Sequence, residues 1–262
     1  MAIGNLLALL SETPWMTLPS SLDAKAELVK AIYANPSMAM ETKMHPAFAP
    51  KIELVGRTAI LSIEGEMVHK CDDYDTLFGF QSTSKVHEMF LDLANDRTID
   101  QICLYFDCVG GSVIGGAEFA EDIWNCEKPV IAFTDGYMTS LAYLWGSACD
   151  KIYATPTSQV GSIGVILQVW KAKYEGIELY SFKAGEKKDY GSPYTEISEN
   201  EINYFQNKVN YSYEQFVNAV SLYRSWGVEE IIATQAGYDS AGAMPFFVDE
   251  IITKKEFIKN NF

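Results

Sequence analysis

Ser140 is the residue in this sequence best placed to act as a nucleophile. It follows the apolar run 129–134 and opens an apolar segment with helical spacing, Leu141–Cys149. The start of a helix offers unpaired backbone amides that stabilise a developing negative charge, and the Leu141 amide is one such donor. Taken alone, Ser140 is also an ordinary helix-capping residue. Its segment lacks the GxSxG pattern of α/β-hydrolases, which disfavours that fold.

A serine nucleophile needs a base to remove its proton. All histidines of the chain precede residue 88, and none lies in a loop that the predicted topology clearly brings to Ser140: His45, His69 and His87. Lysine can replace histidine when burial lowers its pKa, because burial disfavours the charged form. The polar segment after residue 182 offers three candidates, each of which is also an ordinary surface lysine: Lys183, Lys187 and Lys188.

A glycine-rich turn, Asp107–Gly116, follows a strand-like run and opens a helix-like one. Its glycines would let a backbone amide approach a carbonyl and stabilise the oxyanion of acyl transfer. A phosphate-binding loop is an alternative, but the turn has neither the Gly-Lys-Ser/Thr ending of a P-loop nor GxGxxG spacing. A plain strand-to-helix connection is the third interpretation.

The elements that must position these residues alternate between strand and helix. Apolar runs predict strands at 58–65, 99–106, 129–134, 151–155, 163–167 and 177–182. Helical spacing predicts helices at 21–33, at 84–96, through Trp124, over 139–149, and from about Ile197 onwards. This alternation predicts an α/β fold with a parallel or mixed sheet covered by helices. An aromatic stripe in the last helix favours core or a subunit interface over a cofactor site: Tyr204, Phe205, Tyr211, Tyr213 and Phe216.

Composition excludes several classes of protein. The 262 residues include 20 Lys plus Arg and 35 Asp plus Glu, a net charge of −15, which disfavours nucleic-acid and anionic-membrane binding. The five cysteines form no CxxC and predict a reduced, cytoplasmic protein. No metal or cofactor is expected, because histidines and cysteines are not at ligand spacing. The apolar stretch 2–10 is too short to span a bilayer, so no membrane anchor is expected.

Four segments, taken together, resemble the signal peptide peptidase A (SppA) family of Ser/Lys peptidases in the ClpP/crotonase superfamily. They are LYFDCVGGSV, DGYMTSLAYLWGSACDKIYATPTSQVGSIGVI, FKAGEKKDYGSPYTEIS and AGYDSAGAMPFFVDEI, and the resemblance covers about residues 57–253. It implies a ClpP/crotonase-like spiral of β-β-α units over 56–253, preceded by an N-terminal arm (1–55) and followed by C-terminal helices and a tail (254–262).

The resemblance also implies a role for individual residues. Ser140 would be the nucleophile and Lys188 the base. The amides of Gly111 and Leu141 would form the oxyanion hole, with Gly110 and Ser162 in support. Polypeptide substrates and a homo-oligomeric ring are implied as well.

Two departures from the family pattern bear on which branch the chain resembles. Cys108-Val109 replaces Ser-Pro before the glycines, and Leu141-Ala142 replaces Gly-Gly after the serine. The second departure resembles the phage-encoded branch, the head maturation or capsid assembly proteases, whose implied substrates are scaffold or capsid-associated proteins. The alternatives are a housekeeping peptidase that degrades signal peptides or oligopeptides, and a non-catalytic scaffold-binding assembly module.

Overall fold

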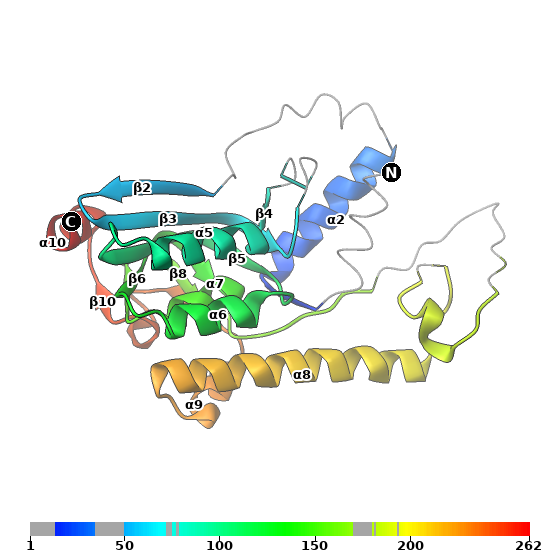
Figure 1. Ribbon diagram of the computed structural model, residues 1–262. Coiled ribbons are helices and arrows are strands. Elements are labelled where there is room, and N and C mark those ends of the chain that lie inside the picture. Colours follow the sequence, from blue (N-terminus) through cyan, green and yellow to red (C-terminus); the bar gives the residue numbers. More distant parts are fainter. Residues whose placement is uncertain are drawn as a thin grey trace.

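The computed structural model describes residues 14–34, 50–71, 75–76, 79–169, 180, 182–192 and 194–262. Within these ranges a large, mostly parallel sheet is covered by helices (Figure 1), which confirms the predicted α/β class. No helix among the described residues is long and apolar enough to cross a membrane.

Ten strands form the sheet. They are β1 (Trp15–Thr17), β2 (Lys51–Val55), β3 (Thr58–Val68), β4 (Phe80–Ser82), β5 (Gln101–Ser112), β6 (Val130–Thr139), β7 (Lys151–Ala154), β8 (Gln159–Gly161), β9 (Tyr238–Ser240) and β10 (Glu250–Ile251). The main order is β10-β7-β6-β5-β3-β2, and β1, β4, β8 and β9 attach beside it. The central pairs, β3 with β5, β5 with β6 and β6 with β7, are parallel.

Helices connect the parallel strands, as crossover connections require. The α-helices are α2 (Pro19–Ala34), α5 (Thr83–Asn95), α6 (Gly116–Trp124), α7 (Leu141–Ser147), α8 (Glu199–Arg224), α9 (Val228–Ala233) and α10 (Lys254–Asn261), with 3₁₀ turns η2 (Glu186–Asp189) and η3 (Pro245–Phe247). α8 runs along one side of the molecule, and its N-terminal half extends past the sheet (Figure 1).

The central strand β5 separates two hydrophobic clusters. Alternate side chains of a strand point to opposite faces of its sheet. Ile102 and Leu104 therefore join the main core with α5, α6 and α7, whereas Cys103 joins a smaller cluster that includes Phe257 of α10. Burial on both faces explains why this strand reads as a near-continuous apolar run in the sequence.

Two of the predicted strands, 163–167 and 177–182, are not among the strands that the structure describes. The strand predicted at 163–167 is wrong: β8 ends at Gly161, and only an isolated bridge at Ile166 follows. Gly161 and Ser162, directly before this segment, have φ values of 104° and 59°, so the segment does not continue β8. The strand predicted at 177–182 lies almost entirely outside the described residues.

Segments at both ends of the chain pack on the sheet. β1 pairs with the end of β5, and β2 forms the edge beside β3. In α10, Phe257 is buried and stacks on Phe133 at 4.1 Å between ring centroids. The boundaries at 55 and 253 stay a prediction.

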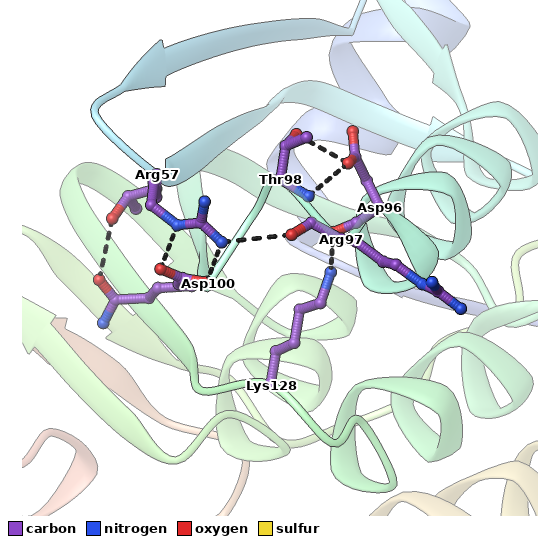
Figure 2. A network of polar contacts seen from close by, with 8 residues as sticks. Arg57, Asp96, Arg97, Thr98, Asp100 and Lys128 are labelled. Atoms are coloured by element: carbon purple, nitrogen blue, oxygen red, sulfur yellow. Dashed lines mark hydrogen bonds and ion pairs between the residues drawn. The ribbon is translucent and has the colours of Figure 1, made fainter.

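A polar network fixes the turn between α5 and β5 at the start of the sheet (Figure 2). Arg57 donates to the Asp100 carboxylate through two nitrogens and to the Arg97 carbonyl at 3.2 Å. Lys128 donates to the carbonyls of Leu93 and Asp96 at 2.7 and 2.6 Å. The starts of β3 and β6 are thereby tied to one turn.

This network predicts a pH-dependent stability. The hydrogen bond from Arg57 lowers the pKa of Asp100 below its ordinary value. A carboxyl whose folded-state pKa is lowered stabilises the fold above its unfolded pKa, near 4, and loses that contribution as the pH falls through the folded value. In urea titrations, wild type should therefore exceed Asp100→Asn in stability at neutral pH. The gap should close progressively below about pH 4. A gap that stays constant from pH 7 to pH 3 would contradict this assignment.

Candidate active site

Ser140 joins β6 to α7 in a conformation that non-glycine residues rarely adopt, with φ 57° and ψ −119°. Such a conformation costs on the order of 1–3 kcal/mol and persists only where its surroundings fix it. Here the Ser140 amide donates to the Gly161 carbonyl at 2.8 Å, and its carbonyl accepts from Leu144 at 3.0 Å. A strained strand-to-helix turn presents the nucleophilic serine in α/β-hydrolases. The geometry is present here without the GxSxG sequence.

The elements on both sides of Ser140 are rigidly held. All residues of α7 are buried. Tyr143 donates to the Phe247 carbonyl at 2.9 Å, and the Trp145 indole donates to the Gly116 carbonyl at 2.9 Å. On the strand side, the Thr139 hydroxyl donates to the Val109 carbonyl at 3.1 Å. This packing keeps the strained turn in place.

The Ser140 side chain is buried. The residue is 0% exposed, and its hydroxyl donates to the Gly164 carbonyl at 3.4 Å, a long hydrogen bond. The adjoining Leu141 is the first residue of α7, where backbone amides have no acceptor within the helix. A reacting carbonyl beside Ser140 would therefore meet one unpaired amide.

Gly110 and Gly111 lie at the end of β5 between two neighbouring strands. Their partners are Thr17 and Met16 in β1 and Glu66 and Met67 in β3. A Cβ on Gly110 would lie 2.0 Å from the Met16 carbonyl oxygen, and one on Gly111 would lie 2.2 Å from that of Met67. Only glycine allows backbone to approach this closely.

Gly110→Ala should therefore destabilise the protein more than alanine at another glycine with positive φ. Gly110 has φ 116° and no room, whereas Gly56 has φ 63° and open space. Left-handed backbone costs about 1–2 kcal/mol for alanine, and the clash adds about 1–3 kcal/mol. Urea unfolding should show that Gly56→Ala loses only the backbone cost in unfolding free energy. Gly110→Ala should lose the backbone cost and the clash cost together. Equal losses of stability in the two variants would mean that β1 shifts to accommodate the new Cβ at no energetic cost.

Cys108 is the other nucleophile near the glycines, and it is not activated. Burial raises the pKa of its thiol to about 12, so it stays protonated at neutral pH. The residue is 0% exposed, and its sulfur lies 3.4 Å from the Gly110 amide nitrogen. Cys108 is a buried residue of β5, because the strand runs on through the first half of the turn predicted at 107–116 and ends at Ser112.

Lys188 lies on η2. Its side chain is exposed, and within the described part of the chain it contacts neither Ser140 nor Ser162. In Figure 1 the yellow segment that holds η2 lies at the N-terminal end of α8, beyond the sheet. Of the other candidate lysines, Lys183 pairs with Asp189 at 2.6 Å, and the Lys187 amine lies 4.8 Å from the Tyr204 ring centroid.

The segment around Lys188 is fixed to α8. The Gly191 amide donates to Glu201, a carboxylate only 3% exposed, at 2.8 Å. The Tyr190 ring packs against those of Tyr204 and Phe205, with centroids 5.4 and 6.4 Å away. A buried carboxylate and an aromatic cluster therefore hold this segment on the helix that extends past the sheet.

The remaining predicted residue, Ser162, directly follows Gly161, whose carbonyl accepts from the Ser140 amide. It has φ 59°, is 7% exposed, and its amide donates to the Gly237 carbonyl at 2.8 Å. The structure thus brings Ser140, Leu141, Gly110, Gly111 and Ser162 to one end of the sheet and leaves Lys188 apart from them.

Sequence reasoning missed β1 as a neighbour of the glycines. The short run Trp15–Thr17 carries no motif, and its only local signal is the pair of prolines that bracket it, Pro14 and Pro19. It also missed the buried carboxylate Glu66, which is 1% exposed and hydrogen-bonded by Thr17. No group of three or more potential metal ligands occurs among the residues that the structure describes.

Comparison with known proteins relates the chain to peptidases. It is 25% identical over 221 residues to capsid assembly protease C of Escherichia phage lambda, covering 81% of this chain and 50% of the relative. It is 23% identical over 235 residues to head-tail preconnector protein GP5 of Enterobacteria phage P21, covering 85% and 47%. It is 30% identical over 177 residues to "Putative protease MJ0651" of Methanocaldococcus jannaschii, covering 64% and 57%.

The chain spans about half the length of these curated relatives. Residues 124–261 match peptidase family S49. This match starts before the strained serine, includes the lysine segment and extends over more than half of the sequence. The protein therefore belongs to peptidase family S49.

Proposed function

We propose that the protein is a serine endopeptidase in which Ser140 is the nucleophile and Lys188 the base. The observation that carries this proposal is the strained strand-to-helix turn at Ser140, with φ 57° and ψ −119°. Strain of this kind concentrates at catalytic sites, where it presents a side chain that an ordinary cap would not. The match to a peptidase family supports the same reaction class.

In the proposed reaction, neutral Lys188 takes the hydroxyl proton as Ser140 Oγ attacks a peptide carbonyl. The amides of Gly111 and Leu141 stabilise the oxyanion. Lys188 then returns the proton to the leaving amine, and water hydrolyses the acyl-enzyme with the same lysine as base. Gly110 would allow the close approach of backbone, and Ser162 would orient the amine.

The position of Lys188 leads us to propose that a neighbouring copy of the chain supplies it. The lysine is exposed, and its segment is held on α8 by Glu201 and the Tyr190 cluster. Leaving that site to reach Ser140 in the same chain would break these contacts. Packing against a second copy would instead bury the amine and disfavour its charged form, as a base requires. A homo-oligomeric ring, with a ClpP/crotonase-like spiral in each copy, fits this arrangement.

Mixing two inactive variants tests this shared site. Ser140→Ala and Lys188→Met chains should each be inactive, whereas an equal mixture, co-refolded or exchanged, should regain about a quarter of wild-type activity if neighbours combine at random. No recovery in oligomers shown to contain both chains would mean that each chain uses its own lysine.

The proposed substrates are phage scaffold or capsid-associated proteins, because two relatives are a capsid assembly protease and a head-tail preconnector protein. A housekeeping peptidase is the second candidate, and the similarity to a protein from Methanocaldococcus jannaschii favours keeping it. Co-expression with a candidate scaffold protein and mass mapping of the cut sites, for wild type and Ser140→Ala, distinguishes them. Specific cuts in the scaffold protein that vanish in Ser140→Ala support scaffold processing. An intact scaffold protein together with degraded short peptides supports the housekeeping activity.

If neither the scaffold protein nor short peptides are cleaved, the remaining candidate is a non-catalytic scaffold-binding module.

A further inference from the structure

The end of β5 has two edges at which another strand can pair. β1 pairs along the edge on the side of β6 and Ser140. On the first edge, β3 stays paired with β5 as far as Gly111. On the second, β6 is paired with β5 up to Cys108, then ends at Thr139 and turns into α7 at Ser140. β1 therefore continues the line of β6 on that second edge.

The other side of β1 is also occupied. Trp15 and Ile166 exchange two backbone hydrogen bonds, of 2.7 and 2.8 Å. Ile166 follows β8, which pairs with the end of β6. β1 thus fills a slot between the end of β5, Gly110–Ser112 (the glycine strand), and Ile166 in the segment after β8. This slot lies directly beyond Ser140. The Thr17 and Thr139 hydroxyls lie 3.4 and 3.1 Å from the same carbonyl oxygen, that of Val109.

Within this slot, β1 presents its backbone to the glycine strand as a bound peptide would. Pro14 accepts from the Val113 amide, whereas Trp15 turns both backbone groups to Ile166. Because backbone groups alternate along a strand, the Met16 carbonyl turns towards Gly111. That residue holds one of the two proposed oxyanion donors. Extended peptides commonly bind by adding such a strand to an open sheet edge.

A buried carboxylate holds β1 and the start of α2 in place. Glu66 accepts hydrogen bonds from Thr17 at 2.6 Å and Ser21 at 2.9 Å, and it pairs with Lys25 at 2.7 Å. Trp15 and Ser140 are both 0% exposed. With β1 in the slot, neither the serine nor the strand beside it is exposed to solvent.

We propose that the slot beside Ser140 is the binding channel for an extended substrate peptide, and that β1 is its intramolecular occupant, which substrate must displace. This inference rests on the proposed function. The ligand class is an unfolded polypeptide strand, bound antiparallel to Gly110–Ser112. Glu66 is the latch: its contacts with Thr17, Ser21 and Lys25 set the fraction of chains in which the channel is open.

A reversible crosslink tests whether β1 must leave. Trp15 and Ile166 form a directly opposed antiparallel pair, a spacing that a disulfide can bridge. In the double variant Trp15→Cys with Ile166→Cys, oxidation should lower casein cleavage at least about tenfold, because activity follows the open fraction. Dithiothreitol should restore it. Wild type, which has five cysteines, receives the same treatment as a control. Full activity in the verified oxidised form would make β1 a permanent wall and overturn the inference.

The proposed role of Glu66 predicts that weakening its contact with β1 raises cleavage, whereas the crosslink lowers it. Thr17→Val removes the donor to Glu66, so casein cleavage should rise about three- to tenfold. Thr58→Val is the matched control, because Thr58 is a buried threonine at the other end of β3 that also donates one side-chain hydrogen bond, to Gln101 at 3.2 Å. It should leave cleavage unchanged. An equal effect of both variants, or none from Thr17→Val, would contradict the role of the latch.

Hydrogen exchange separates failure of this inference from failure of the proposed function. In the full-length Ser140→Ala chain no cleavage is needed. Excess casein should speed exchange of the Trp15 amide several-fold, while the Ile166 amide stays protected by the incoming strand. If both amides keep their protection although casein binds, β1 is not displaced. If wild type, reduced double variant and Thr17→Val all fail to cleave casein while casein still releases Trp15, the channel stands and the peptidase assignment falls.

Discussion

Ser140→Ala is expected to reduce peptide cleavage by at least about 10⁴-fold while leaving the fold unchanged. The hydroxyl is the proposed nucleophile, and without it only the oxyanion donors and substrate binding remain. Structurally the change removes one long hydrogen bond, 3.4 Å to the Gly164 carbonyl. Alanine also keeps the backbone of the strained turn, since both residues carry a Cβ at φ 57°. Circular dichroism and urea midpoints should therefore match wild type.

Ser147→Ala is the matched control for this prediction. Ser147 is also 0% exposed and lies at the end of α7, where its hydroxyl donates to Leu144 at 2.7 Å. Losing that hydrogen bond should cost about 0.5–1.5 kcal/mol of stability without loss of cleavage. Ser140→Ala with normal cleavage of casein or scaffold would refute the nucleophile. Equal loss of activity in both variants would point to damage to α7 instead.

The second large effect is expected at Lys188. Lys188→Met removes the only atom that can take up a proton in this side chain, so cleavage should fall by about 10²- to 10⁴-fold. Lys187→Met is the matched control, because Lys187 is the adjacent residue of η2, is also exposed and packs over Tyr204. That variant should retain most of the activity.

Lys188→Arg distinguishes a base from a positive charge at an interface. Arginine keeps the charge but cannot lose its proton at neutral pH, so this variant should remain inactive. Its oligomeric state, followed by light scattering, should match wild type. Recovery of cleavage in Lys188→Arg would assign the lysine to assembly, and activity in Lys188→Met would remove it from the reaction.

The sequence predicted the central elements well because local patterns and the final packing agree there. The run that became β5 is apolar on both faces, and the segment 84–96 has helical spacing with a buried stripe, so period and burial point the same way. The strand expected at 163–167 is absent, and the two residues directly before it, Gly161 and Ser162, have positive φ and turn the backbone where β8 ends. Serine gives no local signal of such a conformation.

The candidate site also contains residues that local sequence patterns predict and one residue that they do not. Ser140 and the pair Gly110-Gly111 could be found from the sequence, because both follow strand-like runs whose ends meet at one edge of a parallel sheet. Lys188 could be named only through a family resemblance. Its exposure and its attachment to α8 depend on contacts with Glu201 and Tyr204 that no local pattern contains.

By itself, the sequence determined the α/β class and the peptidase family and named the candidate serine and glycine residues, since these follow from periodicity and from motifs that are local in the chain. Only the tertiary structure decided that Trp15–Thr17 lies beyond Ser140, between Gly110–Ser112 and Ile166. Pairing between strands about 100 residues apart depends on which sheet edge is left open, and that is settled by all the other strands together.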